Sequence, residues 1–364
     1  MLKIQRPKVN LQLSRVCSSR AFSMSYKRKI KKYLADGLSK MLSIDALDRF
    51  AHGMKSSLTI LGYHRIKDKP CSDGRFDDGL INATCEEFEW QVKYLKRNFN
   101  PITFNDLKDT VESGGRLPER AVIISFDDGF DDNYFNAFKI LKSHSVPATF
   151  FVTTGLIDSN ELFWFEKIHF ILSDPDLDKI PGPDGEYDIL NSNRAPHILA
   201  LTEKLKTLSD RQRRQYIHEL EKEVNFDPSN LNLAESRTMT WEQVIEMSKS
   251  GMEIGSHSVS HPILSMLADS ALAQELRESK LTIERKIGKE VTVLAYPNGS
   301  EASVGKRVEE ATKEAGYSFA VKYGLYGDNQ FSKLKHYSLQ RVGIQGYHRQ
   351  GSFKLAMLYP QLVF

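Results

Sequence analysis

The chain has 364 residues, of which 40% are hydrophobic and 27% charged, and its formal net charge is only +3. This length allows one elaborated domain or two smaller ones, and the charge balance gives no indication of a nucleic-acid partner. No stretch approaches the roughly 18 apolar residues that cross a bilayer, so we do not expect an integral membrane protein. The three cysteines, Cys17, Cys71 and Cys85, are an odd number without CxxC spacing. That pattern argues against a disulfide framework or a structural zinc cluster and favours a reducing compartment.

The first 35 residues contain ten Lys or Arg, and the first acidic residue is Asp36. A basic, serine-containing segment of this kind is typical of an organelle transit peptide, but it also fits a solvated tail or a start at Met24. The segment lacks the apolar run of about 7 to 15 residues of a secretory signal. We therefore expect a cytoplasmic protein, with organelle targeting, or export to the cell surface by another route, as alternatives. Residues 36–50 show helical apolar spacing, so 1–56 are interpreted as a basic tail and a packing helix.

Beyond residue 56, short apolar runs alternate with amphipathic segments. The apolar runs that predict strands lie within the stretches 57–66, where the run ends at His64, 121–130, where it stops at the two aspartates, 147–156, 252–257, 290–299 and 317–323, and 336–344 is the final segment of the series. The predicted helices are 85–99, 133–146, 240–251, 269–287 and 306–316. Thr240 and Gln243 form a candidate capping box, and Gly288 is a stop signal for the helix before it. Buried strands that alternate with helices predict a parallel α/β arrangement.

The pattern changes between about 157 and 238, where helical stretches surround a Pro/Gly-rich loop and no strong strand is visible. The strand pattern resumes afterwards, so we interpret this segment as a mainly helical insertion into one domain that spans 57–345. Residues 346–364 are then a C-terminal extension. The aromatic run Phe163, Trp164 and Phe165 is interpreted as packing anchors, with a carbohydrate platform as the alternative.

Polar groups follow three of the predicted strands: Asp127 and Asp128, then His257 and His261, and finally the stretch Pro297-Asn298-Gly299. Reactive groups collect at the carboxyl ends of parallel strands, so we expect these stretches to share one site. Two imidazoles and one carboxylate, with positions open for water, suit zinc and other divalent transition metals. The second carboxylate can act as a general base. Adjacent aspartates can serve these different roles only if the chain turns, which Gly129 permits.

Four motifs give the sequence a family resemblance: LGYHRI at 61–66, SFDDGF at 125–130, EIGSHSVSHP at 253–262 and LAYPNG at 294–299. The chain resembles the polysaccharide deacetylases, carbohydrate esterases with a NodB-type domain, and in particular their exopolysaccharide branch. The resemblance covers roughly 57–156 and 238–345. It implies a distorted (β/α) barrel with fewer than eight regular strands.

The resemblance also implies roles for individual residues. Asp127 would be the catalytic base, and Asp128, His257 and His261 would bind the metal. The backbone N–H of Asn298 would help to stabilise the tetrahedral oxyanion.

The sequence departs from the family pattern at two places. Ala295 stands where many members have an arginine that orients the base, and Arg341 could supply that group from another strand end or could equally lie on the surface. The usual Leu-x-His motif near the C-terminus, which carries the general acid, has no clear counterpart. His64 is our preferred acid because it ends the first strand, with His336 and His348 as alternatives.

These inferences predict a zinc-dependent hydrolase that removes N-acetyl groups from the amino sugars of a polysaccharide or glycan precursor. Two alternatives stay open. The same metal and base could cleave another non-peptide amide on a small molecule, or the chain could be a catalytically impaired protein that binds glycans.

Overall fold

The computed structural model describes residues 57–68, 77–183, 185–188, 194–228, 233, 236–301, 303–324, 329–346 and 348–358. The basic segment, the predicted helix at 36–50, Cys17 and Cys71 lie outside these residues. Cys85 lies within them as a free thiol.

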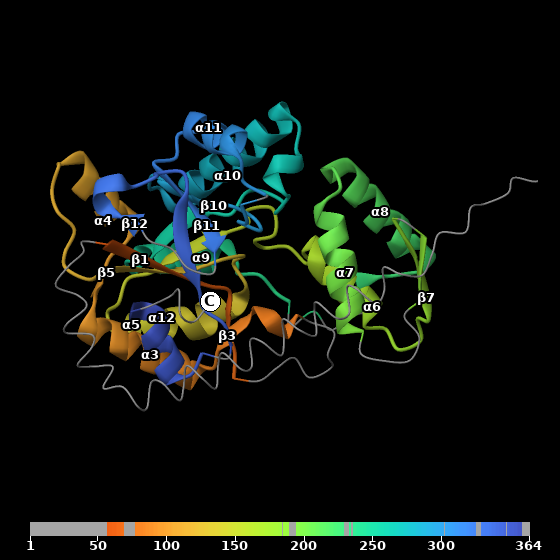
Figure 1. Cartoon of the computed structure of the whole chain (residues 1–364), viewed down its shortest axis with the longest axis horizontal. Helices are drawn as coiled ribbons and strands as arrows, with labels where there is room; N and C mark the ends of the chain where they lie inside the picture. Colours follow the sequence, from red (N-terminus) through yellow and green to blue (C-terminus); the bar gives the residue numbers. More distant parts are fainter. Residues whose placement is uncertain are drawn as a thin grey trace, which may run out of the picture.

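Seven parallel strands close into a barrel at the centre of the molecule (Figure 1). Closure occurs because β1 pairs in parallel with both β5 and β13. In order around the barrel, the strands are β1 (Ser57–Tyr63), β5 (Ala121–Phe126), β6 (Thr149–Val152), β9 (Glu253–Ser256), β10 (Val293–Ala295), β11 (Phe319–Gly324) and β13 (Leu339–Gly343). The predicted distorted barrel of fewer than eight regular strands is thereby confirmed.

Two short strands pair with strands of the barrel, and two others form a separate sheet. The strand β4 (Asn100–Pro101) lies parallel to β5, β12 (Asn329–Gln330) lies antiparallel to β1, and β2 (Arg65–Ile66) pairs with β3 (Ile81–Ala83). The strands β3, β4 and β12 have no counterpart in the sequence analysis, because two or three residues are too few to show a hydrophobic period, whereas β2 falls within the predicted stretch 57–66.

Helices cover the outside of the barrel (Figure 1). They are α3 (Cys85–Asn98), a π-helix at Asn133–Phe138 that continues into α5 (Lys139–Ser143), α9 (Trp241–Lys249), α10 (Asp269–Ile287), α11 (Lys306–Glu314) and α12 (Gln350–Leu358). The capping box of Thr240 and Gln243 begins α9 as predicted, and α10 ends at Gly288 with φ of +68°. Among the helices that the structure describes, none is long and apolar enough to cross a membrane.

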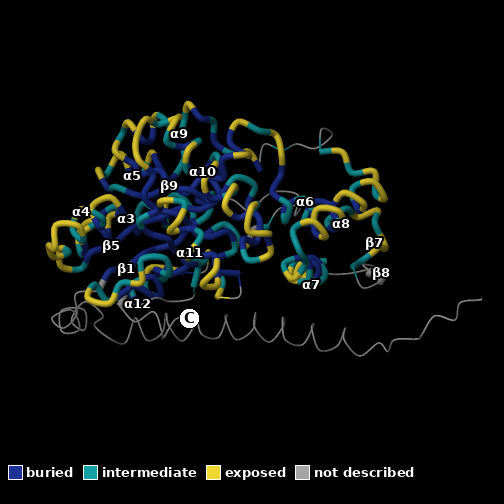
Figure 2. The backbone as a smooth tube through the Cα atoms, turned by 90° about the horizontal axis from the view of Figure 1, so that it is seen from above, coloured by how far each residue is buried: buried dark blue, intermediate teal, exposed yellow. Residues whose placement is uncertain are grey.

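Alternate strand residues face the inside of the barrel and form a core of their own. This core contains Leu58 and Ile60 of β1, Ile123 of β5 and Phe151 of β6. At the amino end of the strands it includes Phe104 and Leu107 from α4 (Phe104–Glu112). Figure 2 shows the strands almost entirely in the buried colour, while the outer turns of the helices are exposed. The carboxyl end is therefore the end that α4 leaves accessible for a site.

A lobe formed by residues 164–223 extends to one side of the barrel (Figure 1). It consists of α6 (Trp164–Leu172), a hairpin of β7 (Lys179–Gly182) and β8 (Gly185–Asp188), α7 (Ala195–Lys206) and α8 (Asp210–Glu223). Its apolar residues form a separate cluster that includes Ile171, Leu201 and Leu220. The predicted insertion is thus mainly helical, but its Pro/Gly-rich loop forms a hairpin.

Candidate active site

The polar residues singled out in the sequence follow strands of the closed barrel. Asp127 comes directly after β5, His257 directly after β9 and His64 directly after β1. Arg341 lies within β13, and Asn298 lies in the loop after β10. Because all five strands are parallel, these residues gather at the carboxyl end of the barrel.

Asp128, His257 and His261 form a buried group with the composition of a metal site. Oδ1 of Asp128 lies 3.3 Å from Nε2 of His257 and 3.4 Å from Nε2 of His261. The ligand atoms of the three residues all lie within 4.8 Å of one another. Nδ1 of His257 lies 2.8 Å from the carbonyl oxygen of Ala295. Since a carbonyl can only accept, Nδ1 carries the hydrogen and Nε2 keeps its lone pair for a metal. The donor set therefore fits a divalent transition metal.

The chain turns sharply at the aspartate pair. Asp128 has φ of +74° and Gly129 has φ of +84°, so the turn begins at Asp128, one residue before the glycine that we expected to provide it. A left-handed conformation costs a non-glycine residue about 1–2 kcal/mol, which the surrounding contacts must offset. Two backbone hydrogen bonds fix the turn: Asp127 N donates to Tyr63 O at 2.9 Å, and Met239 N donates to Gly129 O at 2.8 Å. The turn points the adjacent carboxylates at different partners.

Asp127 is paired with Arg341 through two parallel hydrogen bonds. Nη1 and Nη2 of Arg341 each lie 2.7 Å from one carboxylate oxygen of Asp127. The exposed fraction of the side chain is 0% for Arg341 and 3% for Asp127, so the surface alternative for Arg341 is wrong. Burial works to raise the pKa of Asp127, but the Arg341 guanidinium and the nearby His257 outweigh it. The pKa of Asp127 therefore lies below its ordinary value, and the group is ionised at neutral pH.

Of the three histidines considered as the acid, His64 lies at the carboxylates. Its backbone N donates to Oδ1 of Asn82, and its carbonyl accepts from Nδ2 of Asn133 at 2.7 Å. Burial works to raise the pKa of Asp128, yet its contacts with the imidazoles of His257 and His261, and the nearby imidazole of His64, hold that pKa well below its ordinary value. No sequence signal identified Asn82, which lies in the three-residue strand β3, or Asn133, which begins the π-helix, since a single buried asparagine has no characteristic pattern.

The other two histidines belong to the segments on either side of β13. His336 precedes β13, at the opposite end of the barrel, where its carbonyl accepts from Ala320 N at 2.7 Å and its ring contacts Phe319. His348 is buried after β13, and burial lowers its pKa to about 3, so it is neutral at physiological pH.

Asn298 has φ of +64° and is half-buried. Its loop is fixed to β11 by a hydrogen bond from Tyr323 N to Gly299 O at 3.0 Å.

The start of the lobe, together with Phe163 directly before it, contributes a wall of the site. The rings of Phe163 and Phe165 lie 5.3 Å and 5.5 Å from the ring of His261. Phe163 is buried against Phe130, whereas Phe165 is half-buried. Below them, Glu166 accepts from Phe163 N at 3.2 Å and from Oγ of Ser236 at 2.5 Å. The sequence predicted packing anchors here but not that they contact a metal-site histidine.

Comparisons with known proteins agree with this geometry. A family model described as polysaccharide deacetylase matches residues 114–320, which is more than half of the chain. A poly-beta-1,6-N-acetyl-D-glucosamine N-deacetylase of Staphylococcus epidermidis is 32% identical over 167 residues, covering 43% of this chain and 55% of that protein. A protein of the same description from Staphylococcus aureus is 41% identical over 115 residues, covering 28% of this chain and 37% of its own length. The matched part of the chain thus spans about half or less of these relatives.

Solved structures share the fold. The deacetylase PplD of Streptococcus pyogenes, in complex with acetate, aligns with a TM-score of 0.56 at 16% identity, over 83% of this chain and 98% of that one. IcaB from Ammonifex degensii aligns with a TM-score of 0.52 at 18% identity, over 84% and 97%. With the barrel, the buried Asp-His-His group and the family match together, the chain belongs to the polysaccharide deacetylase family.

Proposed function

We propose that the chain is a metal-dependent hydrolase that removes N-acetyl groups from the amino sugars of a polysaccharide or glycan precursor. The observation that carries this proposal is the pair of adjacent carboxylates, of which Asp128 faces two imidazoles while Asp127 is paired with a buried arginine. The names of the similar proteins support poly-N-acetylglucosamine as the class of substrate.

Asp128, His257 and His261 would bind the metal, for which zinc is our proposal. When bound, such an ion polarises a carbonyl and lowers the pKa of water towards about 7. Asp127, ionised and oriented by Arg341, takes a proton from the water that attacks the amide carbon. Because Arg341 binds both carboxylate oxygens, the base cannot rotate away from the attacking water.

The remaining steps need a proton donor and an oxyanion partner. His64 would give its proton to the leaving nitrogen as the carbon–nitrogen bond breaks, so the products are acetate and a free amino sugar. The backbone N–H of Asn298 would donate to the oxygen on which negative charge develops. Both roles are proposed from the position of these residues at the same end of the barrel as Asp127.

Acetate release from N-acetylglucosamine oligomers, measured with added Zn²⁺ and with a chelator, tests this function. We expect the chelator to abolish release, and Asp127→Asn to slow it by about 100-fold or more, the usual contribution of a general base. Asp131→Asn is the matched control, because Asp131 is a partly exposed carboxylate four residues further along. No release from any N-acetylated glycan with Zn²⁺ present, or full activity in Asp127→Asn, would refute the proposal.

A second function, cleavage of another non-peptide amide on a small molecule, is favoured by one observation. The aromatic wall of Phe163 and Phe165 beside His261 narrows one side of the site. A screen of small N-acetylated compounds beside the oligomers would separate the two functions. The third possibility, an impaired glycan-binding protein, depends on the absence of the C-terminal motif that carries the general acid. His64, directly after β1, is our candidate for that acid, so this possibility has less support.

A further inference from the structure

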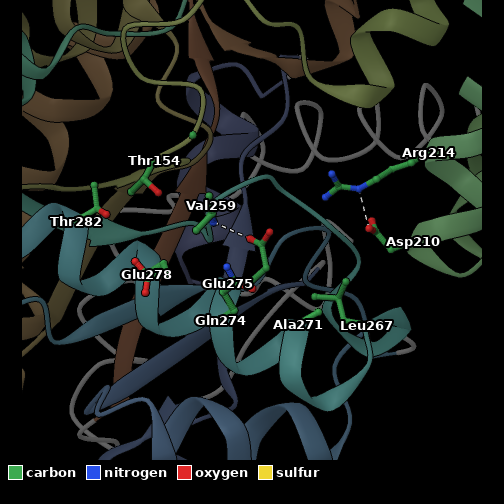
Figure 3. Close-up of a pocket in the computed structure, with 11 residues that line it drawn as sticks. Thr154, Asp210, Arg214, Val259, Leu267, Ala271, Gln274, Glu275, Glu278 and Thr282 are labelled. Carbon is green, nitrogen blue, oxygen red and sulfur yellow. Dashed lines mark hydrogen bonds and ion pairs between the residues drawn. The ribbon is translucent and has the colours of Figure 1, made fainter. Parts of the chain in front are cut away.

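The loop that joins the two metal-site histidines is bound from outside the barrel by α10. One carboxylate oxygen of Glu275, Oε2, accepts from Val259 N at 2.8 Å and from Ser260 N at 3.0 Å. The other oxygen, Oε1, accepts from Oγ of Ser260 at 2.6 Å. Figure 3 shows Glu275 reaching from α10 toward Val259. A single side chain thus satisfies three donors of the segment between His257 and His261.

A second contact from the same helix lies one turn further along. Oγ of Ser279 lies 2.6 Å from Oγ of Ser256, and both side chains are buried. Oγ of Ser256 also accepts from Ser258 N at 3.3 Å. Residues four apart share one face of a helix, so Glu275 and Ser279 anchor the chain on both sides of His257.

The loop requires such anchors because of its backbone conformation. Ser258 has φ of +65° and His261 has φ of +55°, and each such non-glycine residue costs about 1–2 kcal/mol. Within the loop, His261 N donates to Oγ of Ser258 at 3.1 Å. Hydrogen bonds to a charged acceptor are roughly twice as strong as those to a neutral one, so the three bonds to the Glu275 carboxylate help to offset this cost.

The lobe contacts the same loop at Ser260. Nη2 of Arg214, on α8, donates to Oγ of Ser260 at 3.0 Å, and Nε of Arg214 pairs with Asp210 at 2.7 Å. A hollow of about 500 Å³ lies between these groups and α10, and Glu278 and Gln274 line it (Figure 3). The loop therefore has solvent-accessible space behind it and depends on these side chains for support.

We propose that Glu275 is a positioning residue for the metal site, which keeps Ser258 and His261 in their left-handed conformations so that His257 and His261 stay directed at Asp128. The inference rests on the proposed function, because it assumes that these histidines bind a metal. Groups that orient metal ligands typically contribute 10- to 100-fold to metal affinity or activity.

The test is a Zn²⁺ titration against a competing chelator, together with the absorption spectrum of the Co²⁺-loaded protein. Glu275→Ala should weaken Zn²⁺ binding about 10-fold or more and change the Co²⁺ spectrum. Glu275→Gln, which retains one acceptor oxygen, should lie between Ala and wild type. Glu278→Gln is the matched control, since Glu278 is an exposed carboxylate on the same helix and should leave binding unchanged.

Thermal unfolding of the metal-free variants separates positioning from general damage. If Glu275→Ala does not fold, the Zn²⁺ titration is made with Glu275→Gln and Ser279→Ala instead. Faster hydrogen exchange at the amides of Val259 and Ser260 in the folded variants would support the inference. Wild-type affinity in all of these variants would overturn it while the proposed function stands. A wild-type protein that binds neither Zn²⁺ nor Co²⁺ would overturn both.

Discussion

Replacing Arg341 with Met should destabilise the protein strongly, because it leaves the Asp127 carboxylate buried without a counter-charge. The pair has two hydrogen bonds of 2.7 Å, and neither side chain is exposed by more than 3%, so water cannot take the place of the guanidinium. Breaking a buried ion pair from one side costs about 3–5 kcal/mol. We expect a loss of that size in the free energy of unfolding.

Asp127→Asn in the same background should recover most of this loss, because the cost comes from the unpaired charge and not from the missing contacts. The double variant should therefore show a coupling free energy of at least about 2 kcal/mol relative to the two single variants.

The assay is urea unfolding at neutral pH in the presence of a chelator, so that metal binding does not contribute. Arg307→Met is the control: Arg307 lies 2.6 Å from Asp269, but the two side chains are 44% and 89% exposed. Exposed pairs contribute about 0–1 kcal/mol. Nη2 of Arg307 also donates to the carbonyls of Ser265 and Leu267, so this variant should lose more than the pair alone contributes but less than Arg341→Met. Equal losses in Arg341→Met and Arg307→Met, or additive effects of the Asp127 and Arg341 changes, would refute the reasoning.

Three further predictions concern pH, metal and the lobe. Burial raises the pKa of Glu166 from 4.5 to about 7, so stability should be lost as pH rises from about 4.5 through about 7, by up to about 3 kcal/mol. Glu166→Gln should flatten that part of the curve of unfolding free energy against pH, and an unchanged slope would contradict the assignment. A chelator should lower the unfolding temperature, since a ligand at 100 times its Kd stabilises by about 2.7 kcal/mol; His261→Ala should remove the effect in thermal-shift measurements. Phe165→Ala should raise KM for the oligomers severalfold with little change in kcat, whereas Leu199→Ala, at a 50% exposed position of the same lobe, should change neither. An unchanged KM would show that the aromatic wall does not contact substrate.

Features with local signals could be predicted from the sequence. The bounds of α10, Asp269 to Ile287, follow from apolar spacing and the glycine that ends the helix, and the structure has the same bounds. The residues Asp128, His257 and His261 could be grouped because each follows a strand, and parallel strands bring their carboxyl ends together. The division of the chain into a domain, an insertion and an extension stays a prediction.

Features that depend on distant contacts could not be predicted. Glu275 is one of several acidic residues on α10, and only the folded loop distinguishes it from Glu278. The contact of Phe165 with His261 joins a residue of the lobe to a residue nearly a hundred positions later, and no period in the sequence encodes it. The hairpin of β7 and β8 is a different case, because the glycines and prolines near its turn are visible in the sequence but by themselves indicate only a loop.

Closure of the barrel by its first and last strands has a consequence for biosynthesis. Asp127 and Arg341 are 214 residues apart, so at 5–20 residues per second the carboxylate is synthesised roughly 10 to 40 seconds before its partner. Until β13 emerges, β1 and β11 lack the neighbour that they share in the finished barrel, and open strand edges promote aggregation. The last strand therefore completes both the hydrogen bonding of the barrel and the charge balance of its interior. A chain that stops before residue 339 should remain a substrate for chaperones, even though it already contains Asp128, His257 and His261.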